Sequence, residues 1–242
     1  MKKASIRINI KGSQILIHTM GLVEYFGPIL FHSLFYYFSG IYGYGPFAHT
    51  QTQKFAFWMV ILHFVKREYE CLFVHKSSKS SMPVFSASKS LLHYWGTAGI
   101  LLGYFLYVPT TYYLNSNSYL FKVNNLPSWL NYGIFATWAF AEFSNFKTHR
   151  ILAKIRRGGN EKKYAIPFGY GFDQVSCPHY FFESLGWLTF SLLVGHWSAW
   201  FFFITGTGQM VIWAVQKHNW YQQNFGDEFI KLNRKIYIPY II

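Results

Sequence analysis

Hydrophobic residues of this chain gather into six long runs, and polar segments separate each run from the next. Each run approaches the about 20 mostly apolar residues that a helix needs to cross the hydrocarbon of a bilayer. The last two runs are joined almost without a loop, near His196 and Trp197. The pattern predicts an all-α integral membrane protein, a bundle of about six transmembrane helices. The predicted spans are Leu22–Ile41, Phe55–Val74, Leu91–Val108, Leu130–Phe146, about Tyr180–Gly195 and about Ser198–Val215.

Composition agrees with this class. Charged residues make up 13% of the chain and aromatic residues 22%, whereas about 25% of a soluble domain is charged. Tyr and Trp in such numbers fit the aromatic belts at the two membrane surfaces. We expect residues 1–20 to form a short cytosolic segment and residues 21–242 to form one transmembrane domain. The two cysteines, Cys71 and Cys177, offer no disulfide framework.

Basic residues predict the orientation of the chain, because cytosolic loops of membrane proteins carry an excess of Lys and Arg. They gather before the first run and after the second, fourth and sixth runs, with Lys54 and Lys122 as exceptions. Both termini are therefore predicted to be cytosolic. The bias accounts for much of the net charge of +13 without a nucleic-acid partner, and it favours contact with anionic membrane lipid.

Two polar segments stand next to the fifth run. Residues 176–183 place His179, Tyr180 and Glu183 at its mouth, where an ionisable group needs a partner, water or a ligand. Residues 156–164 form a basic, glycine-containing hairpin just before. Arg side chains and glycines suit a multiply phosphorylated ligand, but the same hairpin is equally consistent with a plain topology signal.

Carboxylates interrupt other runs. Lys66 and Arg67 lie four and three residues before Glu70, so this cluster can neutralise itself on one helix. Glu24 has no such local cation, and Pro28 follows it by four residues in the same run. Irregular backbone at membrane depth is tolerated beside protein or a cavity. Glu24 is therefore a candidate functional residue.

Metal and nucleotide motifs are absent from the sequence. The ten histidines lie at least 12 positions apart, and no His-Glu-x-x-His pattern occurs, so no metal site is predicted. No Walker A loop or dinucleotide-binding Gly-rich strand turn is present either. Gly206 and Gly208 lie within the last apolar run, where small residues usually allow close helix packing. Tyr, Glu, His and Lys at helix ends can polarise a carbonyl and deliver a proton while a cofactor supplies hydride, which favours reduction of an alkene conjugated to a carbonyl.

Several segments, in this order along the chain, resemble the very-long-chain trans-2-enoyl-CoA reductases of the steroid 5-alpha-reductase family. The resemblance extends from about residue 20 to the C-terminus. It implies an endoplasmic-reticulum enzyme that reduces trans-2-enoyl-CoA to saturated acyl-CoA with NADPH, the last step of fatty-acid elongation. Implied partners are the elongase, the ketoacyl reductase and the hydroxyacyl dehydratase. The segments are Val23–Pro28, His63–Lys76, Tyr94–Gly96, Asn145–His149, Val175–Glu183 and Gly206–Tyr221.

The resemblance also implies roles for individual residues. Tyr180 matches the proton donor of enoyl reductases, Lys66 matches an essential motif position, and Glu24 matches the carboxylate that engages the substrate carbonyl in the steroid branch. Phe64 departs from that branch, which has Tyr there, and this increases the weight of Tyr180. The implied NADPH-binding residues are Asn145, His149, Arg156, Tyr164, His179, Glu183, Lys217, His218 and Tyr221, with Arg157 joining Arg156 as a phosphate ligand.

Alternatives stay open at this point. A steroid or polyprenol reductase shares the fold, although Phe64 argues against it. A membrane methyltransferase that uses S-adenosylmethionine has a similar spacing of Pro178, Tyr180 and Glu183, but it usually carries Arg-His before the proline. A scaffolding protein would tolerate substitutions at Tyr180 and Glu24. Enoyl reductases usually begin with a ubiquitin-like domain, whereas about 20 residues precede the first run here. Either residues 5–10 are a remnant strand of that domain or the chain is a reduced form, and both alternatives stay open.

Overall fold

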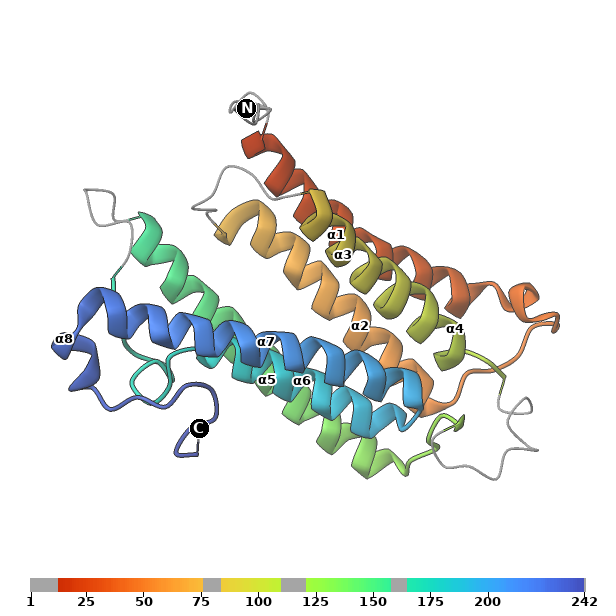
Figure 1. The fold of residues 1–242 in the computed structure, drawn as a ribbon. Coiled ribbons are helices and arrows are strands. Elements are labelled where there is room, and N and C mark those ends of the chain that lie inside the picture. Colours follow the sequence, from red (N-terminus) through yellow and green to blue (C-terminus); the bar gives the residue numbers. More distant parts are fainter. Residues whose placement is uncertain (1–12, 76–83, 110–120, 158–164, 242) are drawn as a thin grey trace.

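The computed structural model describes residues 13–75, 84–109, 121–157 and 165–241, and long helices dominate it (Figure 1). In the described part of the chain, β-structure is limited to an isolated parallel bridge between Val175 and Lys235. The α-helices are α1 (Ser13–Tyr37), α2 (Gln51–Tyr69), α3 (Val84–Leu91), α4 (Leu102–Leu106), α5 (Ser128–Arg157), α6 (Pro178–Val194), α7 (Trp197–Phe225) and α8 (Asp227–Ile230). A 3-10 turn, η1 (Ser39–Tyr42), and two π-helical segments, η2 (Glu70–Val74) and η3 (Leu92–Leu101), complete the order.

A long helical unit lies at each of the six predicted runs, with α3, η3 and α4 forming one continuous unit. The boundaries differ from the prediction. Helix α1 begins at Ser13, inside the segment assigned to a short N-terminal region, and α5 continues to Arg157. By length and composition, one described helix, Trp197–Phe225, is long and apolar enough to cross a membrane. The fold is therefore helical as expected, and the number of membrane crossings stays a prediction.

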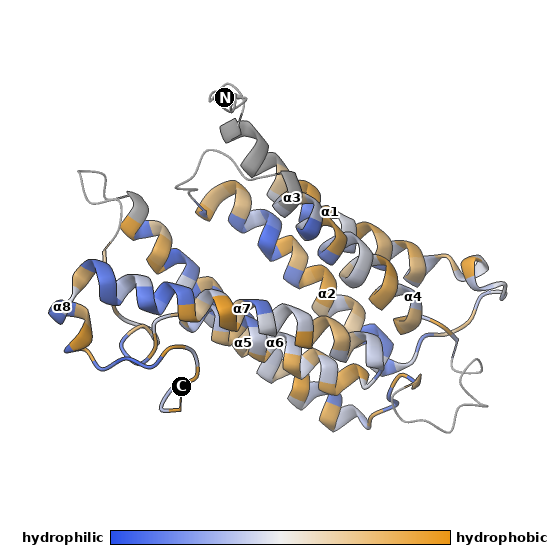
Figure 2. Ribbon diagram, in the orientation of Figure 1, coloured by the Kyte–Doolittle hydropathy of each residue, from blue (hydrophilic) through white to orange (hydrophobic). Residues whose placement is uncertain are grey.

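The helices form two groups that meet along α2 (Figure 1). In the first group, α1 packs against α2, η3 and α4. In the second, α6 packs between α5 and α7. Helix α2 joins the groups because it also contacts α5 and α6. Figure 2 shows a hydrophobic α4 and a mostly hydrophilic C-terminal end of α7.

Glycine brings α1 and η3 into very close contact. A Cβ atom at Gly27 would lie 2.4 Å from the Trp95 ring, so only glycine fits there. The Trp95 indole N–H donates a hydrogen bond of 2.8 Å to the Val23 carbonyl, which fixes the ring against α1. This contact sets the position of η3, which carries residues of the candidate site.

Local signals explain how α6 and α7 are joined. Pro178 occupies the first turn of α6, where its missing N–H costs no helical hydrogen bond. The helix ends at Gly195, which adopts φ 75° and so permits a tight reversal. The His196 side chain then accepts a hydrogen bond from the Ser198 N–H and caps α7. The prediction of two helices joined almost without a loop is confirmed.

Candidate functional site

Helix α2 directs one polar stripe toward α5 and α6. His63, Lys66 and Arg67 of α2 and Glu70, the first residue of η2, follow the three- and four-residue spacing of a single helix face. His63 is 2% exposed and Glu70 is fully buried. Ionisable groups at this depth need partners, and each of the four has one on another helix.

The first half of the stripe ties α2 to both neighbours. His63 Nδ1 lies 2.9 Å from Glu142 on α5, and its Nε2 lies 3.3 Å from Glu183 on α6. Lys66 Nζ lies 2.6 Å from Glu142 and donates a 2.7 Å hydrogen bond to Asn145. The expected pairing of Lys66 with Glu70 within one helix is thus corrected, because the Lys66 side chain turns to α5 and pairs with Glu142 there.

The second half of the stripe is a buried network around Arg67. Arg67 Nη1 donates to Glu70 at 2.7 Å, as the three-residue spacing predicted, and the other Glu70 oxygen lies 2.9 Å from His149 Nδ1. Arg67 Nη2 donates to the Tyr25 hydroxyl at 2.7 Å. The Tyr25 ring also packs edge-to-face on Tyr94 of η3, with ring centroids 5.0 Å apart. The network therefore connects α1, α2, η3 and α5 at one end of the bundle.

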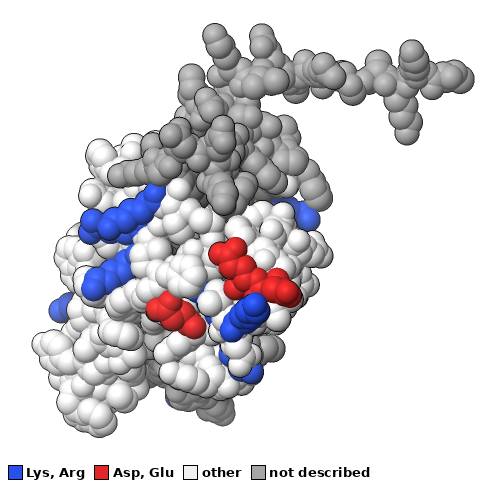
Figure 3. Space-filling view, turned by 90° about the vertical axis from the view of Figure 1, so that its left-hand side faces the viewer, with Lys and Arg blue, Asp and Glu red and all other residues white. Residues whose placement is uncertain are grey.

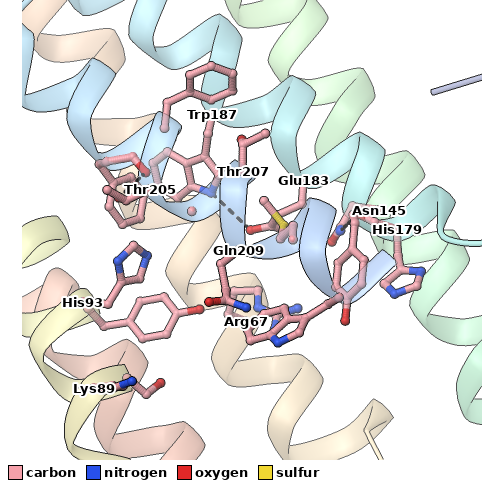
Figure 4. A pocket seen from close by; sticks show the side chains of 18 of the residues that line it. Arg67, Lys89, His93, Asn145, His179, Glu183, Trp187, Thr205, Thr207 and Gln209 are labelled. Atoms are coloured by element: carbon pink, nitrogen blue, oxygen red, sulfur yellow. Dashed lines mark hydrogen bonds between the residues drawn. The ribbon is translucent and has the colours of Figure 1, made fainter. Parts of the chain in front are cut away.

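A cavity of about 520 Å³ lies where α2, α3, η3, α5, α6 and α7 meet. Figure 4 shows Lys89 and His93 on one side of it, Asn145 and His179 on the other, and Glu183 between them. The lining combines polar side chains, among them Arg67, Lys89, Asn145, His149 and His179, with the rings of Trp187, Phe202 and Phe203. Thr205 and Thr207 lie beside Trp187 (Figure 4). Pockets that combine apolar walls with a few convergent polar groups are typical ligand sites.

Three residues of the polar octapeptide predicted as a site, residues 176–183, face this cavity from the first turns of α6. His179, Tyr180 and Glu183 all line it. The rings of His179 and Tyr180 lie 4.1 Å apart, and Tyr180 also packs near Trp213 of α7. Glu183 accepts a 3.1 Å hydrogen bond from the Trp187 indole in addition to its contact with His63. The octapeptide is therefore placed at a ligand-sized cavity.

The C-terminal segment holds the start of α6 in place. The Tyr237 hydroxyl is hydrogen-bonded to Ser184 and donates to the Tyr180 carbonyl at 3.2 Å. Burial raises the pKa of Tyr237 to about 12, so its hydroxyl stays protonated. Burial likewise raises the pKa of Cys177 to about 12, so this cysteine is an unreactive thiol next to the site.

The other two predicted catalytic residues lie behind the cavity wall. Lys66 does not line the cavity itself and reaches it only through its hydrogen bond to the lining residue Asn145, while its other partner is Glu142. Glu24 is 7% exposed and is hydrogen-bonded to Ser90, a lining residue, while its Oε1 has no hydrogen-bond partner among the described residues. Phe64 is fully buried and its ring lies 5.9 Å from Trp187, so it supplies an apolar wall.

A second cluster follows Trp213 by about one turn of α7. Lys217 lies 4.1 Å over the Trp220 ring, His218 is hydrogen-bonded to Ser176 at 2.7 Å, and Tyr221 stacks on Phe229. These three residues are not part of the cavity lining. Of the remaining predicted cofactor residues, Tyr164 and the side chains of Arg156 and Arg157 lie outside the described residues.

Arg234 joins this second cluster and was not singled out from the sequence. Its guanidinium is 6% exposed, lies 4.6 Å from the Phe168 ring centroid and donates to the Pro167 carbonyl at 2.7 Å. Its Nε and Nη2 atoms have no hydrogen-bond partner among the described residues. A buried guanidinium with two such N–H groups is complementary to an anion.

Other site residues were also missed. Glu142 belongs to none of the segments singled out from the sequence, and His63 and Tyr94 stand there only as parts of longer segments. The signal that could have found Glu142 and Asn145 is their three-residue spacing, which places both on one face of α5.

A possible metal set lies at the polar end. Ligand atoms of Glu70, His75 and His149 lie within 4.8 Å of one another. The Arg67 guanidinium lies 2.7 Å from Glu70 and 3.3 Å from His149, and its positive charge opposes a metal ion there. We therefore interpret these residues as a hydrogen-bonded network around Arg67.

Charge on the end of the molecule that carries α8 is mixed. Figure 3 shows basic and acidic side chains next to one another among mostly uncharged atoms on that face. Exposed Asp173, Asp227 and Glu228 offset exposed Lys231 and Lys235 in this region. The described surface there thus lacks the continuous basic stripe that nucleic-acid binding uses.

Comparison with known proteins defines the class. Residues 80–242 match the model of the 3-oxo-5-alpha-steroid 4-dehydrogenase family, and the chain belongs to this family. A Schizosaccharomyces pombe protein provisionally named an enoyl reductase is 41% identical over 99% of this chain and 77% of its own length. The very-long-chain enoyl-CoA reductase of Dictyostelium discoideum is 36% identical over 96% of this chain and 72% of its own. The trans-2,3-enoyl-CoA reductase-like protein of Mus musculus is 29% identical over 88% and 58%.

Proposed function

We propose that this protein reduces trans-2-enoyl-CoA to saturated acyl-CoA with NADPH, in the last step of very-long-chain fatty-acid elongation. The observation that carries the proposal is that one cavity is lined both by Tyr180, Glu183 and Arg67 and by the apolar rings of Trp187, Phe202 and Phe203. Such a lining suits a substrate with a polar thioester and a hydrocarbon chain. The names of the related proteins support the same reaction.

Membership of the family implies a nicotinamide cofactor, and the described residues fit one. The buried Arg234 offers two N–H groups without a partner among the described residues, beside the Lys217, His218 and Tyr221 cluster. An arginine fork matches phosphate geometry. We assign the second cluster to the cofactor phosphates, with Arg156, Arg157 and Tyr164 as further candidates, and Asn145, His149, His179 and Glu183 to its nicotinamide half. When bound, NADPH supplies the hydride that the β carbon of the enoyl group accepts.

The chain supplies hydrogen-bond donors and a proton. As hydride reaches the β carbon, negative charge develops on the thioester oxygen, which needs donors in a water-poor site. Arg67 fixes the Tyr25 hydroxyl, and Tyr94, which packs on Tyr25 and lines the cavity, supplies a hydroxyl for that oxygen. Tyr180 then gives its hydroxyl proton to the α carbon, which completes the saturated product. Because residue 64 is Phe, its side chain has no hydroxyl that could compete with Tyr180 as the proton donor.

In this scheme Glu24 and Lys66 do not line the cavity, and each acts through a residue that does. Glu24 positions Ser90 at the cavity surface. Lys66 holds Asn145, whose side-chain N–H donates to the His179 carbonyl at 2.9 Å. Lys66 thereby fixes the turn of α6 that carries Tyr180, and we class it as a positioning residue.

We also place the protein in the endoplasmic-reticulum membrane, as a bundle of about six spans with both termini in the cytosol. The exposed apolar side chains along α1, α2 and α7 support a lipid-facing surface. The elongase, the ketoacyl reductase and the hydroxyacyl dehydratase of the same cycle are the proposed partners, because they would supply its substrate.

The test is turnover by the purified, detergent-solubilised protein. We expect NADPH oxidation with trans-2-hexadecenoyl-CoA and little with an enone steroid. Tyr180→Phe should lower kcat by about 100-fold or more, because loss of a general acid typically costs that much. Tyr132→Phe is the matched control, since Tyr132 is 60% exposed on α5 and away from the cavity. Undiminished activity of a folded Tyr180→Phe variant would overturn the proton donor, and steroid reduction without enoyl-CoA reduction would overturn the substrate.

A further inference from the structure

Two glycines of α7 face open space instead of a neighbouring helix. A Cβ atom added at Gly206 would meet only the His93 ring, at 3.8 Å, which is an ordinary contact. A Cβ atom at Gly208 would meet nothing within 4 Å. The sequence had indicated close helix packing at this pair, and that expectation is wrong. Gly206 lines the cavity and Gly208 does not.

The space beside Gly206 is a lateral opening of the cavity. Helix α7 touches α4 through His196 and Trp197, whose rings lie 5.0 and 5.5 Å from Phe105. It touches η3 where Phe202 stacks on His93 at 4.8 Å. Beyond this point α7 diverges from α3 (Figure 1). The lining residues there, Thr205 and Gln209 on α7 and Lys89 on α3, are exposed, so the cavity reaches the surface between the two helices.

The chemistry of the opening suits a hydrocarbon chain. Trp187, Phe202 and Phe203 form the cavity wall that leads to it. Outside, Ile204 on α7 is 62% exposed and Leu92 on η3 is 70% exposed. An apolar chain that starts near the Arg67 network can therefore follow the rings of Trp187, Phe202 and Phe203, and it then passes the exposed side chains of Thr205, Gln209 and Lys89 at the opening.

We propose that the acyl chain of the substrate leaves the cavity between α7 and the junction of α3 with η3, over Gly206, and that the missing side chain at Gly206 determines how long a chain is accepted. This inference rests on the proposed reduction of enoyl-CoA. A short acyl chain ends inside the cavity, whereas a long one must pass the glycine. Gly206 is thus a specificity-determining residue of the enzyme.

The test compares Gly206→Leu with Gly208→Leu as the matched control. Both variants replace one glycine of α7 by the same side chain, so intrinsic helix propensity changes equally. For each variant, kcat/KM is measured with crotonyl-CoA and with trans-2-hexadecenoyl-CoA. We expect the ratio of long-chain to short-chain kcat/KM to fall about tenfold or more in Gly206→Leu, because a few methylene groups lose their apolar contacts. In Gly208→Leu the ratio should stay within about twofold of the wild type.

A second readout does not need turnover. Palmitoyl-CoA and butyryl-CoA are added to each protein, and the rise in the thermal unfolding midpoint is recorded. Palmitoyl-CoA should stabilise the wild type and Gly208→Leu more than Gly206→Leu, whereas butyryl-CoA should not distinguish them. If Gly206→Leu does not fold, Gly206→Ala takes its place, with a smaller fall of the ratio in the same direction.

The two hypotheses fail in different ways. An unchanged ratio in a folded Gly206 variant, or an equal fall in Gly208→Leu, overturns the acyl path. If the wild type reduces neither enoyl-CoA but palmitoyl-CoA still separates the two glycine variants, the proposed reaction is wrong and the acyl path is supported. If neither reduction nor selective stabilisation is seen, both are overturned.

Discussion

The two sides of η3 use glycine for opposite purposes. On the side that faces α1, Gly27 lies directly against the Trp95 ring, and the backbones approach closely. On the side that faces α7, Gly206 lies opposite His93 with room for a further carbon atom. In the first case the missing side chain lets two helices touch, and in the second it keeps a passage open.

The difference depends on what the glycine faces. Trp95 is held against α1 by its hydrogen bond to the Val23 carbonyl, so the ring cannot withdraw without losing that bond. Close approach through small residues is a common means of helix association in membranes. His93 instead stacks on Phe202 and lies beside the cavity. A glycine in an apolar helix therefore indicates either close contact with a neighbouring helix or an open space beside it. The residue that faces the glycine decides which of the two applies.

The largest loss of stability should come from adding a side chain at Gly27, where α1 already lies against Trp95 of η3. Gly27→Ala places a methyl group 2.4 Å from the Trp95 ring. We expect the free energy of unfolding to fall by about 3 kcal/mol, the sum of overpacking and a strained or broken Trp95 hydrogen bond. Thermal or denaturant unfolding in detergent measures this change.

The control for this variant is Gly133→Ala on α5, where a Cβ atom would meet nothing within 4 Å. That variant should leave stability unchanged or raise it slightly, since alanine is the better helix former. Equal stability of Gly27→Ala and Gly133→Ala would show that the α1–η3 contact can open without cost.

An intermediate loss of stability is expected at the contact between α2 and α5, where an ion pair rather than a glycine joins the two helices. Lys66→Met removes the cation that lies 2.6 Å from Glu142 and leaves His63 as its nearest partner. We expect a loss of about 2 kcal/mol, below the full cost of an unpaired buried charge because His63 remains. Unfolding of Lys66→Met, Glu142→Gln and the double variant measures it as a double-mutant cycle.

The double variant should recover part of that loss, because no unpaired charge is left. Strictly additive losses in the cycle would show that the Lys66 and Glu142 charges do not interact, and the ion pair would then have no role in joining α2 to α5.

The sequence predicted contacts within helices better than contacts between them. Apolar runs located each long helix, and the Arg67 to Glu70 pairing follows from a three-residue spacing. The octapeptide at the start of α6 was also located, because a polar cluster at the start of an apolar run can be recognised from the sequence alone. The partner of Lys66 was not predictable, because Glu142 lies 76 positions away and helix periodicity relates only close neighbours. The opening beside Gly206 was missed for the same reason.

The smallest effect on stability should come from Gly206→Ala. The added methyl group lies at ordinary contact distance from His93, so no clash opposes it. Replacing a helical glycine by alanine lowers the entropy of the unfolded chain, and we expect stability to rise by up to about 1 kcal/mol. The thermal unfolding midpoint in detergent measures it, with Gly208→Ala as the companion on the same helix. A loss as large as that of Gly27→Ala would mean that η3 and α7 are packed as tightly as α1 and η3, and the comparison would fail. A gain would mean that the chain forgoes available stability at Gly206, which is expected of a residue retained for the space it leaves open.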